Sequence, residues 1–542
     1  MLRPRSFLAT TTGFVAVGLF IGALTDGYVQ ATASGTYGYV HLFTEVLDEV
    51  KRNYVDEKDP KDLVYSSIRG MLRDLDPHSV FLDEVAYGEL RIDTKGSFGG
   101  LGIVISVRDA VLTVISPVEG TPAWEKGIQA GDKIVAIEDE STEGITTEEA
   151  VTKLRGPRGT DVTITVAREG IPETFDYTIT RDVIAIKSIP YSGIVGDDVG
   201  YVRLGNFSEH AGEELRDALD EVLREGARSL ILDLRNNSGG LLDQAVAVSD
   251  LFVEKSSLIV YTKGRQKSDS REWYAKNEQM IRDIPVVVMV NEGTASASEI
   301  VSGAIQDYDL GLIVGVNTYG KGSVQTVRNL SADTALKLTT AKYYTPSGRS
   351  IHRPERDYRR GRGTAAEKDE TETPPEEFLT AGGRPVQGGG GIMPDFEVEA
   401  PDASSLFIEI LRRDLLFKFA VTYTAAHDDL AVQEDFEVDE EMMAAFVEML
   451  DEAEVEYEAE DLAAEEESLK DNIKRQIAIK LWGMEAGYRI GLDTDFQLSE
   501  ALRLMQGARS LDDLLAAAER LEAEAAEIAA ASEDAEEATA LP

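Results

Sequence analysis

Two serines and a lysine in the stretch 291–325 are the residues of this chain best suited to acyl-transfer chemistry. Ser296 and Ser298 follow a run of small residues, and Lys321 lies between two glycines. A serine hydroxyl is a weak nucleophile until a neighbouring base removes its proton, and histidine is the most common base. The stretch contains no histidine and the chain contains no cysteine. These residue types therefore point to a serine that acts with a lysine base.

A lysine has an ordinary pKa of about 10.4 and acts as a neutral base only when it is removed from water. Lys321 follows an apolar run and has no acidic residue beside it in the sequence. Gln325, four residues later, is able to hold the amine through a neutral hydrogen bond. We therefore predict that Lys321 is the general base. The alternative is a lysine that only occupies a glycine turn.

Other serine mechanisms lack their motifs in this chain. No Gly-x-Ser-x-Gly turn is present, so an α/β-hydrolase triad has no anchor. No serine is followed by lysine three residues later, which excludes a Ser-x-x-Lys helix. The five histidines, none of which ends a central strand, are interpreted as structural or surface residues: His41, His78, His210, His352 and His427.

The elements around the two residues predict a parallel βαβ unit. The apolar run 284–290 is typical of a buried strand, the segment after Gly293 has helical spacing, and the run 312–316 predicts the next strand. In such a unit both strand ends lie at the carboxyl edge of the sheet. Ser296 and Lys321 are therefore expected to share that edge.

The surrounding segment 186–350 alternates strand and helix patterns, which predicts an α/β layer. An earlier strand, 229–234, is followed by a loop that ends in Gly239 and Gly240. The segment 353–395 is charged and rich in glycine and proline, and we interpret it as a flexible insertion.

Residues 95–185 differ in character, because short β-type runs alternate with turns. A glycine loop before the first run, formed by Gly100, Leu101, Gly102 and Ile103, is able to present free backbone amides to a chain-terminal carboxylate. Together with the segment 127–137, this loop resembles a PDZ domain in the circularly permuted form found in bacterial proteases. A domain of this kind implies binding of apolar C-terminal tails.

The stretch 291–325 resembles the core of the carboxyl-terminal processing peptidases, also called tail-specific proteases. The resemblance covers about residues 36–400 and implies a multidomain α/β protein with a ClpP/crotonase-like protease core and an inserted β-rich PDZ domain. By motif position, Ser296 matches the nucleophile, Lys321 the general base and Gln325 the residue that orients the lysine. No metal and no cofactor are implied.

The same resemblance assigns supporting roles. Gly239, with Gly240 as the alternative, and Ala297 match the amides of the oxyanion hole. Glu299 and Asp307 match acidic positions that support the serine helix. Arg155 matches the position that relays PDZ occupancy to the core; the alternative is a solvated turn arginine.

The N-terminus predicts export. Arg3 and Arg5 precede the apolar stretch 7–24, and the small residues Ala31 and Ala33 follow. We therefore expect residues 1–33 to be a signal peptide or membrane anchor, which places the protein in the cell envelope, either in the periplasm or anchored to the inner membrane. The remaining divisions are a helical segment (34–94), the PDZ domain (95–185), the protease core (186–400) and an acidic helical region (401–542).

Charge and composition limit the partners. The net charge of −45 argues against nucleic acid, and residues 401–542 carry 37 Asp and Glu against 11 Lys and Arg. The expected substrates are proteins or peptides with apolar C-termini, and an activating adaptor and a homodimer are further expected partners. Two other functions are weighed: a non-catalytic PDZ scaffold with a degenerate core, and acyl-CoA chemistry, which the export signal and the PDZ domain disfavour.

Overall fold

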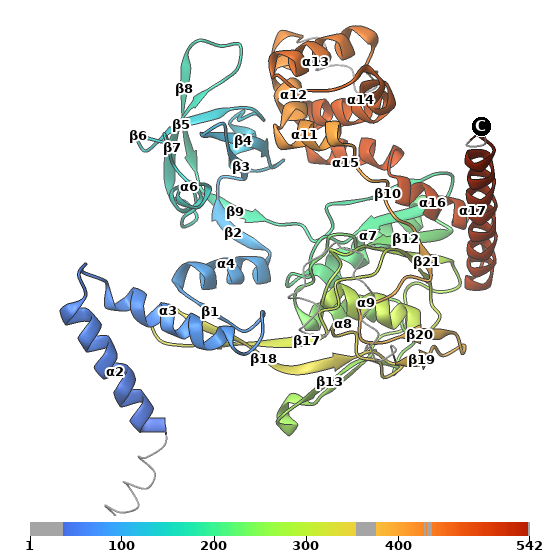
Figure 1. Ribbon diagram of the computed structural model, residues 1–542, viewed down its shortest axis with the longest axis horizontal. Coiled ribbons are helices and arrows are strands. Elements are labelled where there is room, and N and C mark those ends of the chain that lie inside the picture. Colours follow the sequence, from blue (N-terminus) through green and yellow to red (C-terminus); the bar gives the residue numbers. More distant parts are fainter. Residues whose placement is uncertain (1–35, 354–375, 428–429, 431–435, 540–542) are drawn as a thin grey trace, which may run out of the picture. The chain divides into compact units, whose positions relative to one another are not determined.

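The computed structural model describes residues 36–353, 376–427, 430 and 436–539, with side chains up to residue 527 (Figure 1). The predicted signal or anchor, 1–33, lies outside the described residues. Among the described helices, none combines the length and the apolar character needed to span a bilayer. The chain divides into two compact units, one made of the residues up to Tyr87 with Thr326–Thr339, the other of Gly88–Gln325 and the residues from Thr340 onward.

The first unit is mainly helical, as predicted for this part of the chain. It contains α2 (Thr36–Asn53), α3 (Pro60–Arg73) and the short strand β1 (Val80–Leu82). Asp59 caps α3 by accepting a hydrogen bond from the amide of Lys61, and Pro60 occupies the first turn, where its missing N–H costs nothing. β1 pairs antiparallel with residues 335–337 of β18.

The β-rich module of the second unit follows α4 (Glu84–Lys95). A two-stranded ribbon of β2 (Ser97–Gly100) and β9 (Asp182–Ala185) leads into and out of it. The module contains β3 (Ile103–Arg108), β4 (Val111–Pro117), α5 (Pro122–Glu125), β5 (Lys133–Ile137), β6 (Glu140–Ser141), α6 (Thr147–Leu154), β7 (Asp161–Ala167) and β8 (Thr174–Thr180). The strand order β3-β4-β5-β7-β8 leaves β3 at an edge of the sheet.

A six-stranded sheet forms the centre of the second unit, in the order β10-β11-β12-β15-β16-β21. Its strands are β10 (Tyr191–Val195), β11 (Val199–Arg203), β12 (Ser229–Asp233), β15 (Val286–Val290), β16 (Leu312–Gly315) and β21 (Phe396–Glu397). Only the β10–β11 pair is antiparallel. β15 and β16 are parallel neighbours connected through α9 (Ala297–Asp307), so the predicted βαβ unit is confirmed.

Helices cover both faces of this sheet, as a parallel sheet requires. On one face lie α7 (Ala211–Glu225), α8 (Leu242–Ser249) and α9. On the other face, α16 (Phe496–Met505) and α17 (Leu511–Thr539) pack against strands β11, β12, β15 and β16 (Figure 1). The core therefore does not end at the predicted boundary of residue 400, because the acidic C-terminal region supplies one of its layers.

The other C-terminal helices form a bundle with its own apolar core. They are α11 (Ser405–Arg412), α12 (Leu415–Ala426), α13 (Glu440–Glu452) and α14 (Ala459–Trp482), and α15 (Met484–Asp493) packs on α14. α12 contacts the β-rich module: Phe417 and Val421 pack on Ala130, and Lys418 forms an ion pair with Asp109 at 3.0 Å. The bundle is thus joined to the module that precedes the core in the sequence.

A second sheet contains β13 (Leu258–Gly264), β14 (Glu272–Tyr274), β17 (Ser323–Asn329) and β18 (Ala335–Tyr344), with a short 3-10 turn at Lys267–Asp269. A hairpin follows, formed by β19 (Glu377–Leu379) and β20 (Pro385–Gln387). Arg384 anchors it through ion pairs at 2.7 Å with Asp309 and Asp395. Residues 376–395 are therefore ordered, which corrects the predicted flexible insertion at its C-terminal end; residues 354–375 lie outside the described chain.

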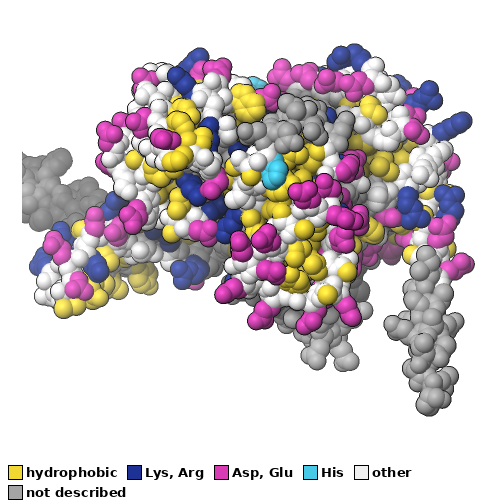
Figure 2. Space-filling view, turned by 90° about the horizontal axis from the view of Figure 1, so that it is seen from above, with side chains coloured by type: hydrophobic (Ala, Val, Ile, Leu, Met, Phe, Trp, Pro, Cys, Tyr) yellow, Lys and Arg dark blue, Asp and Glu magenta, His cyan; other side chains and the backbone are white. Residues whose placement is uncertain are grey.

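The surface reflects the acidic composition. Figure 2 shows Asp and Glu side chains spread over the visible face, with Lys and Arg side chains between them. This distribution is the one expected for a chain with a net charge of −45.

Candidate active site

Ser296 lies at the strand-to-helix junction, immediately before α9. Its backbone has φ 56° and ψ −110°, a combination that L-residues rarely adopt. A conformation of this kind costs about 1–3 kcal/mol and persists only when the surroundings hold it. The side chain is half-buried. The structure thus keeps a strained serine at the carboxyl edge of the central sheet.

Hydrogen bonds from the neighbouring strand hold the turn before Ser296. Thr294 donates its hydroxyl to the Leu234 carbonyl (2.9 Å), and the amide of Ala295 donates to the Asn237 carbonyl (3.0 Å). Ser298, the competing nucleophile, donates its hydroxyl to the same Asn237 carbonyl at 2.9 Å and is fully buried. Ser298 is therefore a packing residue in this arrangement.

The carboxylate of Glu299 connects the serine turn to the lysine turn. Its Oε2 accepts hydrogen bonds from the amides of Ser296 (2.7 Å) and Lys321 (2.9 Å). Its Oε1 accepts from the Thr318 hydroxyl (2.5 Å) and the Gly320 amide (2.7 Å). Burial raises the pKa of Glu299, while these four donors act in the opposite direction. Because all four partners are donors, the carboxylate form satisfies every one of them.

Lys321 has an acidic residue close to its backbone, which its sequence neighbours did not indicate. The residues next to Lys321 in the sequence include no acid, but the fold brings the Glu299 carboxylate to its backbone amide. The carboxylate is fully buried. The position of Lys321 is therefore set by an acidic residue from α9 and not only by its own glycine turn.

Tyr343, in β18, is a second connection that the sequence did not indicate. Its hydroxyl lies 3.0 Å from the carbonyl oxygen of Ser296 and also contacts the carbonyl oxygen of Lys321. The ring is 2% exposed. Glu299 accepts from the amides of both residues, and the single hydroxyl proton of Tyr343 is shared between their two carbonyl oxygens, so the backbones of Ser296 and Lys321 are fixed relative to each other.

Replacing Tyr343 with phenylalanine is expected to lower kcat about 10-fold and to destabilise the protein by about 1 kcal/mol, the usual size of one lost hydrogen bond. The ring and its packing remain, whereas the link between the two backbones is lost. Steady-state cleavage and urea unfolding measure the two effects. Tyr344→Phe is the matched control, and equal kcat values for the two variants would contradict the role of the Tyr343 hydroxyl.

The glycine loop after β12 lies against the serine. Gly239 has φ 98°, and a Cβ on it would lie 2.8 Å from the amide nitrogen of Ala297 and 2.9 Å from the Ser296 Cβ. A side chain at this position is therefore excluded by both strain and space. The Gly239 amide donates to the side-chain oxygen of Asn237 (2.9 Å). In the described part of the chain, the amides of Ala297 and Gly240 donate to no acceptor.

Two further predicted residues lie close to these elements. Gln325 donates through Nε2 to the backbone and side-chain oxygens of Ser323, at 3.1 and 2.8 Å. Its orienting effect on Lys321 stays a prediction. Asp307 lies at the opposite end of α9 from Ser296 and forms a buried ion pair with Arg349 at 2.8 Å. Asp307 and Glu299 therefore hold the two ends of the same helix.

The predicted carboxylate-binding loop precedes the edge strand β3. Leu101 is buried in the core of the module, and Gly102 has φ 81° with Thr121 packed so closely that a Cβ would collide with it. Gly100, Leu101 and Gly102 thus form a tight turn that leads into Ile103 at the start of β3. This geometry leaves the edge of β3 beside α6, where an added strand would lie.

Arg155 follows α6 and is part-buried. It forms an ion pair with Glu89 of α4 at 2.5 Å, and its guanidinium lies 4.5 Å from the centre of the Phe98 ring. Phe98 belongs to the ribbon that joins the module to the rest of the unit. Arg155 is therefore a linking residue between α6 and the ribbon, and not a solvated turn arginine.

Comparison with known proteins assigns the chain to a family. The family model for peptidase family S41 matches residues 198–359, and the model for the PDZ domain matches residues 113–168. A carboxy-terminal-processing protease of Bartonella bacilliformis is 40% identical over 346 residues, which are 62% of this chain and 79% of that protein. The chain belongs to the carboxy-terminal processing proteases. The carboxy-terminal processing protease CtpA of Bacillus subtilis is 33% identical over 350 residues, 64% of this chain and 74% of that protein.

Two further matches were found for this carboxy-terminal processing protease. The solved structure of a photosystem II D1 C-terminal processing protease is 31% identical, covers 58% of this chain and 90% of its own, and has a TM-score of 0.34. Residues 406–483 match a family of unknown function, DUF8443.

Membership confirms the predicted multidomain α/β architecture with a PDZ domain and makes the protein a serine-type protease. Sequence reasoning placed Ser296 and Lys321 at two strand ends, and the structure brings both to the Glu299 carboxylate. Tyr343 and Asn237 were missed. Tyr343 lies in an extended run without a motif, and the Asn-Asn pair before the glycines was the only sequence signal for Asn237.

Proposed function

We propose that this protein cleaves exported protein substrates near their C-termini with Ser296 as nucleophile and Lys321 as general base. The observation that carries the proposal is the double connection between these residues, through the Glu299 carboxylate and the Tyr343 hydroxyl. A connection of this kind pre-organises a hydroxyl and an amine from two strand ends, as catalysis between fixed groups requires. Ser296 and Lys321 are only half-buried, whereas Ser298 is fully buried in the packing of the core.

The proposed reaction is acyl transfer through an acyl-enzyme. Lys321, as a neutral amine, takes the proton from the Ser296 hydroxyl while Oγ attacks the scissile carbonyl carbon. The resulting oxyanion is stabilised by backbone amides, those of Ala297 and of Gly239 or Gly240. The lysine returns the proton to the leaving amine, the peptide C–N bond breaks, and a water then hydrolyses the ester with Lys321 again as base.

The PDZ domain supplies substrate selection in this proposal. The tail of the substrate adds as a strand along the free edge of β3, and its terminal carboxylate binds the amides of the Gly100–Ile103 loop. The buried side chains of Leu101 and Leu154 border this region, which favours an apolar terminal residue. Arg155 passes the state of this site to the ribbon through Phe98.

The cellular setting belongs to the same proposal. Export by residues 1–33 places the protease in the cell envelope, in the periplasm or anchored to the inner membrane, where an adaptor and a second copy of the chain are the proposed partners. The runner-up function is a PDZ scaffold whose core does not cleave. It requires that tail binding occurs without turnover.

The test uses a flexible protein substrate that ends in an apolar tail, and the same substrate with an amidated C-terminus. The wild type is expected to cleave the free tail, and amidation is expected to raise KM because the carboxylate contact is lost. Ser296→Ala and Lys321→Ala are expected to lose at least about 10³-fold in kcat, whereas Ser298→Ala remains active. Wild-type rates in either dyad variant would refute the dyad. Tail binding without any wild-type cleavage would favour the scaffold.

A further inference from the structure

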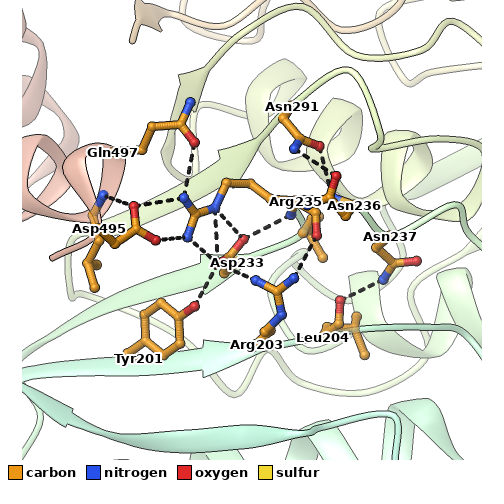
Figure 3. A network of polar contacts seen from close by, with 12 residues as sticks. Tyr201, Arg203, Leu204, Asp233, Arg235, Asn236, Asn237, Asn291, Asp495 and Gln497 are labelled. Atoms are coloured by element: carbon orange, nitrogen blue, oxygen red, sulfur yellow. Dashed lines mark hydrogen bonds and ion pairs between the residues drawn. The ribbon is translucent and has the colours of Figure 1, made fainter. Parts of the chain in front are cut away.

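The strand that precedes the glycine loop ends in a buried cluster of charges (Figure 3). Asp233, at the end of β12, is fully buried and accepts hydrogen bonds from the hydroxyl of Tyr201 (2.6 Å) and from Arg203 (3.0 Å). Arg235, two residues later, donates to the same carboxylate at 2.7 to 3.1 Å. Burial alone would raise the pKa of Asp233, but the two guanidinium groups outweigh it and hold that pKa below its ordinary value.

The other side of the Arg235 guanidinium contacts the C-terminal region. Asp495 accepts from both terminal nitrogens, at 2.9 and 2.5 Å, and the side-chain oxygen of Gln497 accepts at 3.0 Å. With Asp233 and these two partners, all the N–H groups of Arg235 are directed at acceptors. Asp495 is separated from Arg235 by 260 residues, and it is the residue from which α16 starts.

Charge balance makes Asp495 a necessary member of the cluster. Two arginines face two aspartates, and the side chains of Arg235 and Asp495 are 11% and 20% exposed. Without Asp495, Arg203 and Arg235 would share the single carboxylate of Asp233. An unbalanced, largely buried charge favours a rearrangement that exposes it to water.

Such a rearrangement would start at the loop of the candidate oxyanion hole. Arg235 is followed directly by Asn236, whose side chain and amide bond to Asn291 at 3.0 and 2.8 Å. The next residue, Asn237, holds the amides of Gly239 and Ala295. A change in the orientation of Arg235 would therefore move the glycine loop that contains Gly239 and, through Asn237, the turn that precedes Ser296.

We propose that Asp495 is a positioning residue of the protease: through Arg235 it holds the loop 236–240 in the arrangement that receives the oxyanion. The inference rests on the proposed function, because it presumes catalysis at Ser296. The proposal gives the acidic C-terminal region a positioning role in catalysis. Asp495 lies outside residues 198–359, the part of the chain that matches the S41 family, yet it supports the loop of the oxyanion hole.

Asp495→Asn is the informative variant. Asn is as good an N-cap as Asp, so the hydrogen bond that residue 495 accepts from the Leu498 amide (3.0 Å) is retained while the charge is removed. Asp439→Asn is the matched control, because Asp439 caps α13 in the same way, with the Met442 amide at 2.9 Å. Among the described residues no ion pair includes Asp439; the one closest to it in the sequence joins Lys474 to Glu437.

Asp495→Asn is expected to lower kcat about 10- to 100-fold and to change KM less than about twofold, since the loop moves and the PDZ domain does not. Asp439→Asn should keep the wild-type kcat. Phosphonylation of Ser296 by a fluorophosphonate, in which Oγ bonds to phosphorus, fluoride leaves and the phosphonyl oxygen enters the oxyanion hole, should slow in parallel with kcat. Asp495→Glu, which restores the charge, should recover part of the loss.

Hydrogen exchange of the amides of residues 236–240 gives a readout that does not require turnover. Exchange is expected to be faster in Asp495→Asn than in wild type and in Asp439→Asn. Unchanged kcat and exchange in Asp495→Asn would overturn the inference, as would equal losses in the two Asn variants. A wild type that cleaves nothing but shows the exchange difference would instead refute the proposed function and retain the positioning role.

Discussion

Replacing Ser296 with glycine is expected to abolish cleavage and to make the protein more stable than the alanine variant, by about 1 kcal/mol. Both substitutions remove the hydroxyl of the proposed nucleophile. Only glycine adopts φ 56° and ψ −110° without steric cost, and alanine retains the full strain of the serine backbone. The strain relieved is about 1–3 kcal/mol, and the greater freedom of glycine in the unfolded chain offsets about 0.4–1 kcal/mol of it.

The measurement is equilibrium unfolding in urea alongside the cleavage assay. Wild type and Ser296→Ala should have similar unfolding free energies, because they share the backbone strain, whereas Ser296→Gly should be the most stable of the three. A glycine variant less stable than the alanine variant would show that the backbone at residue 296 is not strained. The expected order would establish that this protease gives up stability to present its hydroxyl.

Replacing Glu299 with glutamine is expected to lower kcat by at least about 10²-fold and to destabilise the fold by about 2–3 kcal/mol. The carboxylate accepts four hydrogen bonds, two at each oxygen. A glutamine amide replaces one oxygen with an NH₂ group, which then faces two donors. If the nitrogen takes the Oε2 position, the amides of Ser296 and Lys321 lose their common acceptor, and the two residues are no longer held together.

Glu254→Gln is the control for loss of one negative charge, because Glu254 is exposed, and it should match wild type in both assays. The activity of Glu299→Gln should be compared at a temperature where the variant is fully folded. Wild-type kcat and unfolding free energy in Glu299→Gln would show that the buried carboxylate is replaceable. A loss of stability with unchanged kcat would limit Glu299 to a structural role.

The effect of Asp495 differs from these two in its origin. Glu299 accepts hydrogen bonds directly from the amides of Ser296 and Lys321, whereas the proposed effect of Asp495 passes through Arg235 to the adjoining loop. The α16 and α17 helices cover one face of the central sheet, so the region that carries Asp495 belongs to the folded core. Removal of the whole region would therefore test folding, and the single substitution is the sharper experiment.

Local patterns were sufficient for the parts of the fold that depend on neighbouring residues. The apolar runs before Ser296 and before Lys321 predicted two parallel strands, and the parallel pairing of β15 with β16 confirms them. The alternation of short β-type runs and turns in 95–185 predicted a β-rich domain of the PDZ type. The match of residues 113–168 to the PDZ domain confirms this prediction. These features can be predicted from sequence because a strand or helix with a buried face repeats its apolar residues at a short, regular spacing.

The tertiary structure alone decided how the site is held together. Glu299 reaches Thr318 and Lys321, Tyr343 reaches Ser296, and Asp495 reaches Arg235, all through contacts between elements that lie apart in the sequence. No periodicity reports such contacts, since they depend on strand register and on which helix covers which face. The sequence by itself was thus sufficient to nominate the groups proposed for the chemistry, because their motifs are local. The packing of distant elements decided their backbone conformation and their hydrogen-bond partners, and it brought the C-terminal region onto the central sheet.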